Sequence, residues 1–281
     1  MAATETSSSG PASDAAVIAR PPTRSSKKTF ARLAERQAPL LLLAAVLILW
    51  QLVCSLFSVS EFVFPSPLQI ARALGEFAVP ILGHAWRTFW TTMAGFAIAI
   101  VVGVLLGAVI GASPIAYRAL YPLMTAFNAL PKAAFVPILV VWFGIGVGPA
   151  VLTAFLISFF PIMVNVATGL ATLEPELEDV LRVLGARKTD VLLKVGLPRS
   201  LPYFFASLKV AITLAFVGTT VSEMSASNEG IGYLLVSAGS SMKMPLAFAG
   251  LTVIAAMAMA MYELFSYVER HTTAWAHRGR R

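Results

Sequence analysis

Apolar residues run through this sequence in long stretches that short polar segments interrupt. A helix that crosses a membrane needs about 20 mostly apolar residues, because the hydrocarbon layer is about 30 Å thick. Six stretches meet this requirement, at residues 39–57, 86–110, 120–143, 149–170, 201–221 and 246–267. The pattern therefore predicts an all-α integral membrane protein with about six transmembrane helices.

The third stretch differs from the others because it contains three prolines, Pro122, Pro131 and Pro137. Each proline removes one backbone hydrogen bond from a helix. In a membrane, the freed carbonyl groups must be satisfied by neighbouring helices or by a water-filled cavity. We therefore expect this span to be broken, and to be buried in protein rather than facing lipid.

Two segments between the spans have local signals of their own. Ser66, Pro67 and Gln69 stand where a capping box with proline at the first helical position requires them. The helix that follows has an apolar face but is too short to span, so we expect it on the outer surface. Gly230 and Gly232 predict a turn, followed by a short element at 233–236.

The composition supports the membrane interpretation, since 58% of the residues are hydrophobic and only 12% are charged. A soluble domain carries about 25% charged residues. Residues 1–35 are poor in large apolar side chains and predict a disordered tail, and 36–64 form the first membrane helix and its connection. Positive residues continue to Arg36 and the next apolar run is long enough to span, so we expect a retained anchor. Residues 269–281 form a basic tail.

The basic residues indicate the orientation of the chain, because cytoplasmic segments of membrane proteins are enriched in lysine and arginine. With the N-terminus inside, sixteen such residues lie on the cytoplasmic side, and only Arg72, Arg87 and Lys243 lie outside. Both termini are therefore predicted to be cytoplasmic. The net charge of +7 does not indicate nucleic-acid binding, since the basic residues cluster beside apolar spans.

Sequence features of enzymes are missing. A single cysteine, Cys54, excludes an internal disulfide, and the three histidines lack the spacing of zinc ligands. No G-x-x-x-x-G-K-[ST] phosphate-binding loop occurs, so ATP would have to be bound by another subunit. No serine, histidine and carboxylate set stands out. We expect neither a metal, a cofactor nor a catalytic site in this chain.

The most charged interruption lies between the fourth and fifth spans, at residues 172–200. Leu177, Val180, Leu181 and Leu184 recur at helical spacing, and Gly185 can end that helix in the left-handed conformation. A second short helix is predicted from residue 189. Two capped amphipathic helices predict a binding element rather than a solvated loop that only sorts topology.

This segment resembles the cytoplasmic coupling motif of ABC importer permeases, which is Glu-Ala-Ala, three residues, Gly, nine residues, Ile, one residue, Leu-Pro. Gly185, Val195, Leu197 and Pro198 match that spacing, whereas 179–181 reads Asp-Val-Leu instead of Glu-Ala-Ala. The resemblance implies a loop that binds an ATPase. The residues it assigns to this contact are Glu178, Asp179, Arg182, Gly185, Ala186, Arg187, Leu197 and Pro198.

The resemblance extends from about residue 64 to 268, with a type-1 permease domain at 80–268. The segments "FPSPLQI", "ALPKAAFVPILVVWFGIG", "SFFPIMVNVATGL" and "GIGYLL" are similar to the nitrate, sulfonate and taurine branch of these permeases. This implies a second copy of the chain, ATPase subunits that bind ATP and Mg, and a periplasmic binding protein at a bacterial inner membrane. It also implies a small organic anion as solute. The phrase "LPKAAFVPI" equally resembles permeases for thiamine-precursor pyrimidines, riboflavin or aromatic acids.

Ionisable residues deep in a span are candidates for a solute path. Lys132 and Lys209 lie deep in predicted spans, and Asn128 and Asn165 are weaker polar candidates. Each lysine could instead extend to the interface or pair with a freed carbonyl. Two other classes also remain open, a secondary transporter and a membrane assembly protein.

Overall fold

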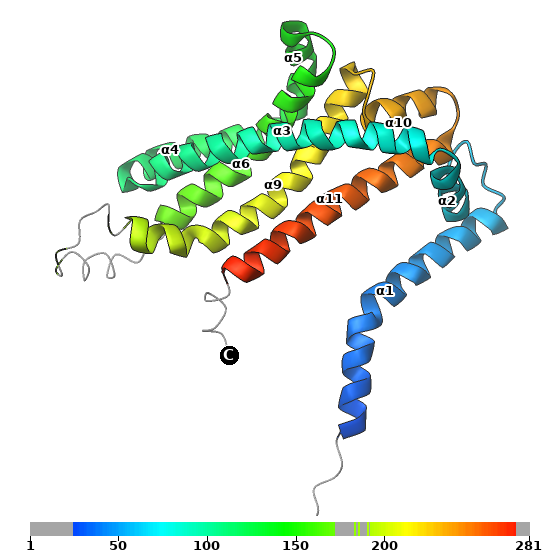
Figure 1. Ribbon diagram of the computed structural model, residues 1–281, viewed down its shortest axis with the longest axis horizontal. Helices are drawn as coiled ribbons and strands as arrows, with labels where there is room; N and C mark the ends of the chain where they lie inside the picture. Colours follow the sequence, from blue (N-terminus) through cyan, green and yellow to red (C-terminus); the bar gives the residue numbers. More distant parts are fainter. Residues whose placement is uncertain (1–24, 172–182, 184, 186–189, 191, 274–281) are drawn as a thin grey trace, which may run out of the picture. The chain divides into compact units, whose positions relative to one another are not determined.

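The computed structural model describes residues 25–171, 183, 185, 190 and 192–273, and it describes side chains from residue 38 onward except those of residues 192, 193 and 197. All regular structure in these ranges is helical. The chain separates into two units, Met1–Leu49 and Trp50–Arg281. Five described helices are long and apolar enough to cross a membrane, and a bent pair raises this to six. The predicted all-α membrane fold is therefore confirmed (Figure 1).

Helix α1 (Ser25–Leu56) contains the first predicted span. Its apolar part, Ala38–Leu56, is long enough to cross a membrane. The first turns of α1 fall within residues 25–35, which the hydropathy pattern assigned to the N-terminal tail.

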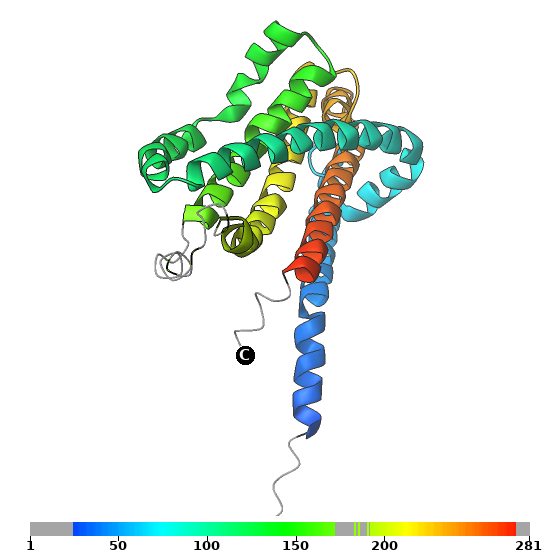
Figure 2. The same cartoon turned by 60° about the vertical axis from the view of Figure 1, so that its left-hand side comes forward.

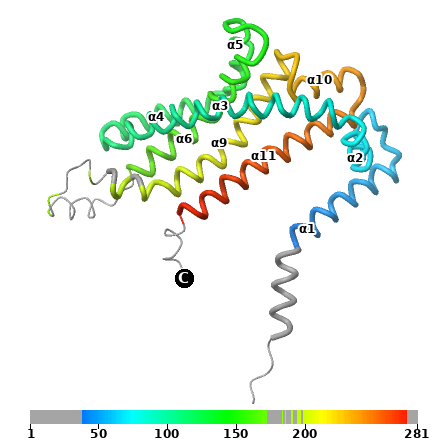
Figure 3. Tube along the Cα trace, viewed as in Figure 1, coloured from blue at the N-terminus to red at the C-terminus, as the bar shows by residue number. Residues whose placement is uncertain are grey.

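The second unit is built around four long helices, α3 (Ala78–Gly111), α6 (Val147–Ala171), α9 (Leu197–Ala226) and α11 (Met244–Thr272). Helix α6 packs along both α3 and α9, and α11 packs along α9 (Figures 1 and 2). Each helix extends beyond the corresponding predicted span, because helical hydrogen bonding continues past the apolar run at both ends. The tube in Figure 3 shows their courses without side chains.

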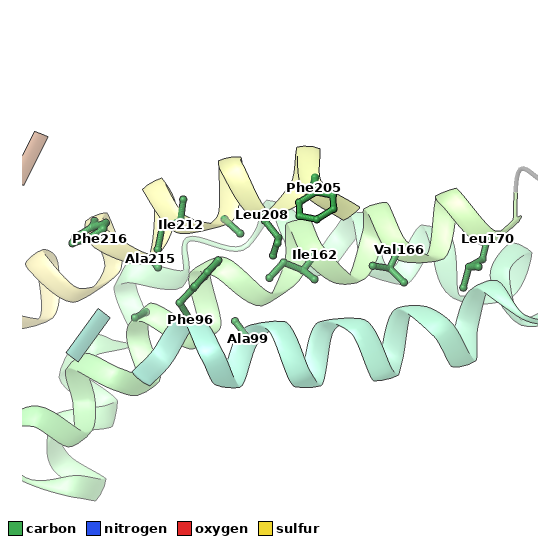
Figure 4. Close-up of a cluster of buried hydrophobic side chains, with 12 residues drawn as sticks. Phe96, Ala99, Ile162, Val166, Leu170, Phe205, Leu208, Ile212, Ala215 and Phe216 are labelled. Atoms are coloured by element: carbon green, nitrogen blue, oxygen red, sulfur yellow. The ribbon is translucent and has the colours of Figure 1, made fainter. Parts of the chain in front are cut away.

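The main core lies where α3, α6 and α9 meet (Figure 4). Phe96 and Ala99 of α3, Ile162 of α6, and Ile212 and Phe216 of α9 are nearly inaccessible to solvent. Lipid tails are as apolar as these side chains, so close packing rather than escape from water holds the helices together. The exposed apolar side chains on the outer faces match a lipid surrounding.

A row of small residues allows α3 and α6 to approach closely. Gly95, Ala99, Gly103, Gly107 and Gly111 recur every four residues and are all buried. A Cβ atom added at Gly107 would lie 2.7 Å from the Met163 carbonyl oxygen and 2.9 Å from the Val166 Cβ. The backbones can therefore pack at this distance only because the row carries almost no side-chain volume.

The third predicted span is broken, as its prolines indicated. It consists of α4 (Pro114–Ala129), a 3-10 turn η1 (Lys132–Phe135) and α5 (Val136–Phe143), with α4 bent by 71° against the segment Lys132–Phe143. Figures 1 and 2 show α5 turning away from α4. The expected burial is not found within a single chain, because Val141 and Trp142 are 82% and 70% exposed. Few neighbouring side chains of the same subunit reach this segment.

Two shorter helices pack at one end of the second unit. Helix α2 (Pro67–Glu76) begins with the predicted capping box. The Ser66 N–H donates to the Gln69 side chain at 2.7 Å, and the Gln69 N–H donates to Ser66 Oγ at 3.4 Å. Its apolar face packs against α11 and joins a cluster with α10 (Ile231–Ser240). The element predicted at 233–236 is thus a longer helix that begins at the predicted glycine turn.

Candidate functional site

Most residues that the resemblance assigns to ATPase coupling lie outside the described residues. These are Glu178, Asp179, Arg182, Ala186 and Arg187. Gly185 is described and has φ 85°, a left-handed conformation that favours glycine over other residues. Its role in ending a helix stays a prediction.

The C-terminal flank of this loop is continuous with a core helix. A π-helical turn η2 (Leu192–Gly196) leads directly into α9, where Leu197 and Pro198 form the first turn. Gly196 keeps helical backbone angles, φ −60° and ψ −54°, so no flexible connection separates η2 from α9. The helical backbone therefore continues from η2 into α9 without a break.

Lys132 and Asn128 lie together at the break of the third span. Lys132 Nζ donates to the Asn128 backbone oxygen at 3.0 Å and to Asn128 Oδ1 at 3.1 Å. The same ammonium lies 5.0 Å from the centre of the Phe160 ring of α6. Lys132 therefore donates one hydrogen bond to a backbone carbonyl close to Pro131, which agrees with the prediction that a deep lysine pairs with a carbonyl beside a proline. Among the described residues, no carboxylate lies within ion-pair distance of Lys132.

A cavity of about 470 Å³ opens beside Lys132 between the broken span and α6. Apart from Lys132, the described residues in its walls all have aromatic or aliphatic side chains. They are Phe127, Leu130, Phe135, Leu139, Trp142, Phe143, Leu152, Phe155, Leu156, Phe159 and Phe160. This volume falls within the range of small-molecule sites in proteins, about 300–1,000 Å³.

The other two path candidates have partners elsewhere. Lys209 of α9 forms an ion pair with Glu269 of α11, with 2.6 Å between Nζ and Oε2, and both side chains are mostly buried. Asn165 donates from its side chain to the Pro161 carbonyl of its own helix at 2.8 Å. The structure therefore brings Lys132 and Asn128 together, whereas Lys209 pairs with a residue of α11 and Asn165 bonds within its own helix.

A buried acidic residue just beyond the fifth predicted span fixes the start of α10. Glu223 of α9 is 3% exposed and accepts hydrogen bonds from Thr88 Oγ1 of α3 at 2.9 and 3.0 Å. The Gly232 N–H donates to Glu223 at 3.0 Å, and the Ile231 N–H donates to Thr88 Oγ1 at 2.8 Å. The Gly230 N–H donates to His84 Nδ1 at 3.1 Å. We call these residues the α10 anchor.

The α10 anchor supplies hydrogen-bond acceptors to the first turn of α10, and it requires glycine at positions 230 and 232. The first N–H groups of a helix have no partner within the helix, and α3 and α9 supply the missing acceptors. A Cβ atom at Gly230 would collide with the Glu223 carboxylate, and one at Gly232 would lie 2.6 Å from the Glu223 Cβ. Gly230 also has φ 97°. An acidic residue just after an apolar span, followed by Gly-x-Gly, was the signal that could have indicated this contact.

Comparisons with known proteins agree on one family. Residues 99–273 match the family described as "Binding-protein-dependent transport system inner membrane component". A probable ABC transporter permease protein of Haemophilus influenzae is 30% identical over 224 residues, 80% of this chain and 91% of the relative. The formylaminopyrimidine transport permease ThiX of Halalkalibacterium halodurans is 28% identical, over 84% of this chain and 95% of the relative.

A further relative and a solved structure support the same assignment. The taurine transport system permease TauC of Escherichia coli is 28% identical, over 83% of this chain and 87% of the relative. An inward-facing structure of the MetNI methionine ABC transporter matches with a TM-score of 0.61 and 16% identity, over 70% of this chain and 98% of the matched chain. At that identity it shows the fold alone. The chain therefore belongs to the binding-protein-dependent inner membrane permeases, the multi-pass membrane subunits of ABC importers, in which a partner ATPase handles ATP.

Proposed function

We propose that two copies of this chain form the path of an ATP-driven importer for a small organic anion at a bacterial inner membrane. The observation that carries the choice of an anion is the difference between the two deep lysines. Lys209 has Glu269 as its partner, whereas Lys132 has only uncharged acceptors among the described residues. A partly desolvated cation without a counter-charge favours an anionic ligand.

Some of the relatives are named for solutes that carry an anionic group, and others are named for heteroaromatic compounds. Permeases named for aliphatic sulfonates, taurine and nitrate are 27%, 28% and 29% identical to this chain. Permeases named for formylaminopyrimidine and riboflavin are equally similar, at 28% and 29%. The aromatic cavity beside Lys132 favours this second group, so a heteroaromatic solute is the alternative that the structure supports.

We further propose that residues 172–200 and both termini lie on the cytoplasmic side, and that residues 172–200 bind the ATPase there. A periplasmic binding protein delivers the solute on the opposite side. The unbroken connection from η2 into α9 supports this mechanism. When ATP brings the ATPase subunits together, the loop moves, η2 follows, and α9 tilts within the packed core. ATP can shift the two access states only by its different affinity for them.

Uptake in cells that contain the partner ATPase and binding protein tests this proposal. We expect uptake of the anion to continue after a proton uncoupler while ATP lasts, and to stop without the ATPase. Gly185→Pro should leave membrane insertion intact and abolish uptake, because proline cannot adopt φ 85°. Uptake without the ATPase that collapses with the proton gradient would indicate a secondary transporter. No uptake under any condition would indicate an assembly protein.

A further inference from the structure

We infer that the cavity beside Lys132 is a solute site for a flat aromatic monoanion, such as an aromatic carboxylate. This inference rests on the proposed function and narrows its solute class. It joins three observations: a wall of aromatic rings, a single cation without a counter-charge, and an opening on one side of the cavity.

The wall is a continuous series of rings contributed by α4 and α6. Phe127 stacks on Phe160 with 6.3 Å between ring centres, and Phe160 contacts Phe159 at 4.6 Å. Phe159 in turn stacks on Phe155 at 5.1 Å. Aromatic pairs favour offset stacked or edge-on arrangements. A flat aromatic ring in the cavity could therefore stack on one of these phenylalanine rings or contact its edge.

Among the described residues that line the cavity, Lys132 alone carries a charge. An ammonium group has three N–H donors, and Asn128 accepts two hydrogen bonds from it. Phe160 lies 5.0 Å away and attracts the positive charge without neutralising it. One donor and the full charge therefore remain for an anionic group of the solute, while the solute's ring would lie against the phenylalanine series.

The same lining argues against the small polar solutes named for other relatives. No acidic side chain of the described residues lines the cavity, so a zwitterion would find one counter-charge there and no carboxylate for its ammonium group. An inorganic anion would contact Lys132 and leave the apolar walls without a partner. An aromatic monoanion satisfies both the walls and the lysine.

The cavity also has an entrance. Trp142 and Phe143 of α5 are 70% and 59% exposed, so the α5 wall stands open on its outer side. A lipid chain or the facing surface of a second copy could cover the same wall. Neither a lipid chain nor a second copy needs the charge of Lys132. Binding of an aromatic anion, by contrast, should depend on that charge.

Equilibrium dialysis of 2-naphthoate against the purified permease–ATPase complex tests the inference. We expect saturable binding, with at least fivefold weaker binding of cyclohexanecarboxylate, which has the charge but no aromatic ring. Lys132→Met should weaken naphthoate binding by about tenfold, the effect of losing one charge-assisted hydrogen bond. Phe160→Leu should also weaken it by removing a ring that faces Lys132.

Lys243 provides a matched control, because its ammonium also lies over a phenylalanine ring, 5.7 Å from the centre of Phe77. Lys243→Met should bind 2-naphthoate like the wild type. Equal binding by Lys132→Met and the wild type would overturn the inference. Equal competition by naphthalene-2-methanol, which is aromatic but uncharged, would show an apolar lipid or subunit surface and would overturn it as well.

The proposed function is measured separately in the same preparation. Co-purification of the ATPase and ATP-driven uptake of any solute test the importer. Binding of 2-naphthoate tests the cavity alone. A complex that imports a solute and yet does not bind 2-naphthoate would refute the aromatic site and leave the importer standing.

Discussion

Replacing Thr88 with valine tests the α10 anchor with almost no change in side-chain shape. The Thr88 hydroxyl donates to Glu223 and accepts from the Ile231 N–H at 2.8 Å. Thr88 is completely buried, so water cannot replace either bond. Valine would leave the Ile231 N–H without an acceptor and would remove one of the donors to the carboxylate.

The expected cost follows from these two bonds. A hydrogen bond to a charged group contributes about 1.5–3 kcal/mol, and a neutral bond about 1 kcal/mol. We therefore expect Thr88→Val to destabilise the start of α10 by about 3 kcal/mol. Since 1.4 kcal/mol corresponds to a factor of ten, amide hydrogen exchange in residues 231–240 should accelerate about a hundredfold.

Hydrogen exchange followed by mass spectrometry on the purified complex measures this change. Thr252→Val is the matched control, because Thr252 is exposed on α11 and its hydroxyl only donates to Phe248 of its own helix. That variant should exchange within threefold of the wild type in residues 231–240. Indistinguishable exchange in Thr88→Val and Thr252→Val would refute the role of the anchor.

Three further substitutions test the packing and the coupling loop. Gly107→Ala should destabilise the α3–α6 contact by about 1–3 kcal/mol through overpacking, whereas Gly83→Ala, on the same helix with open space around it, should be neutral or stabilising in thermal unfolding. Lys209→Met should cost about 3 kcal/mol by leaving Glu269 unpaired, and adding Glu269→Met should recover part of that loss; an additive double mutant would contradict the ion pair. Arg187→Glu should reduce ATPase recovery in pull-downs at low salt more than at high salt, and unchanged recovery would place that charge away from the partner.

Features of the fold that depend on neighbouring residues could be predicted from the sequence. The capping box at Ser66 and Gln69 is one example, because both partners lie within one helical turn. The break of the third span is another, since Pro131 acts on its own backbone. The hydropathy of each span likewise predicted which segments form the long helices, although not where each helix ends.

Contacts between distant segments could not be predicted in this way. Thr88 and Glu223 are separated by 135 residues, and nothing near Glu223 in the sequence identifies Thr88 as its partner. Lys209 was predicted as a possible path residue because it is an ionisable residue deep in a predicted span. Its partner, Glu269, lies in the segment predicted as a basic tail, so the sequence did not indicate the pair. Only the helix packing reveals that this pair joins α9 to α11.

The small-residue row of α3 could be predicted from the sequence only in part. Gly95, Ala99, Gly103, Gly107 and Gly111 stand at four-residue intervals in the sequence, a spacing typical of closely packed membrane helices. The row could therefore have predicted a close helix contact. It could not have identified α6 as the partner, because any apolar helix with a complementary surface fits such a row.

Crosslinking from the loop at 172–200 tests most directly whether this loop binds the ATPase. A single cysteine at Ala186, in a chain where Cys54 is replaced by alanine, can be combined with a short crosslinker in intact membranes that contain the partner ATPase. We expect a crosslinked product that contains both subunits and whose yield changes when ATP is added. If cysteine at 186 never captures the ATPase, although the subunits are present together and uptake is active, residues 172–200 are not the coupling element.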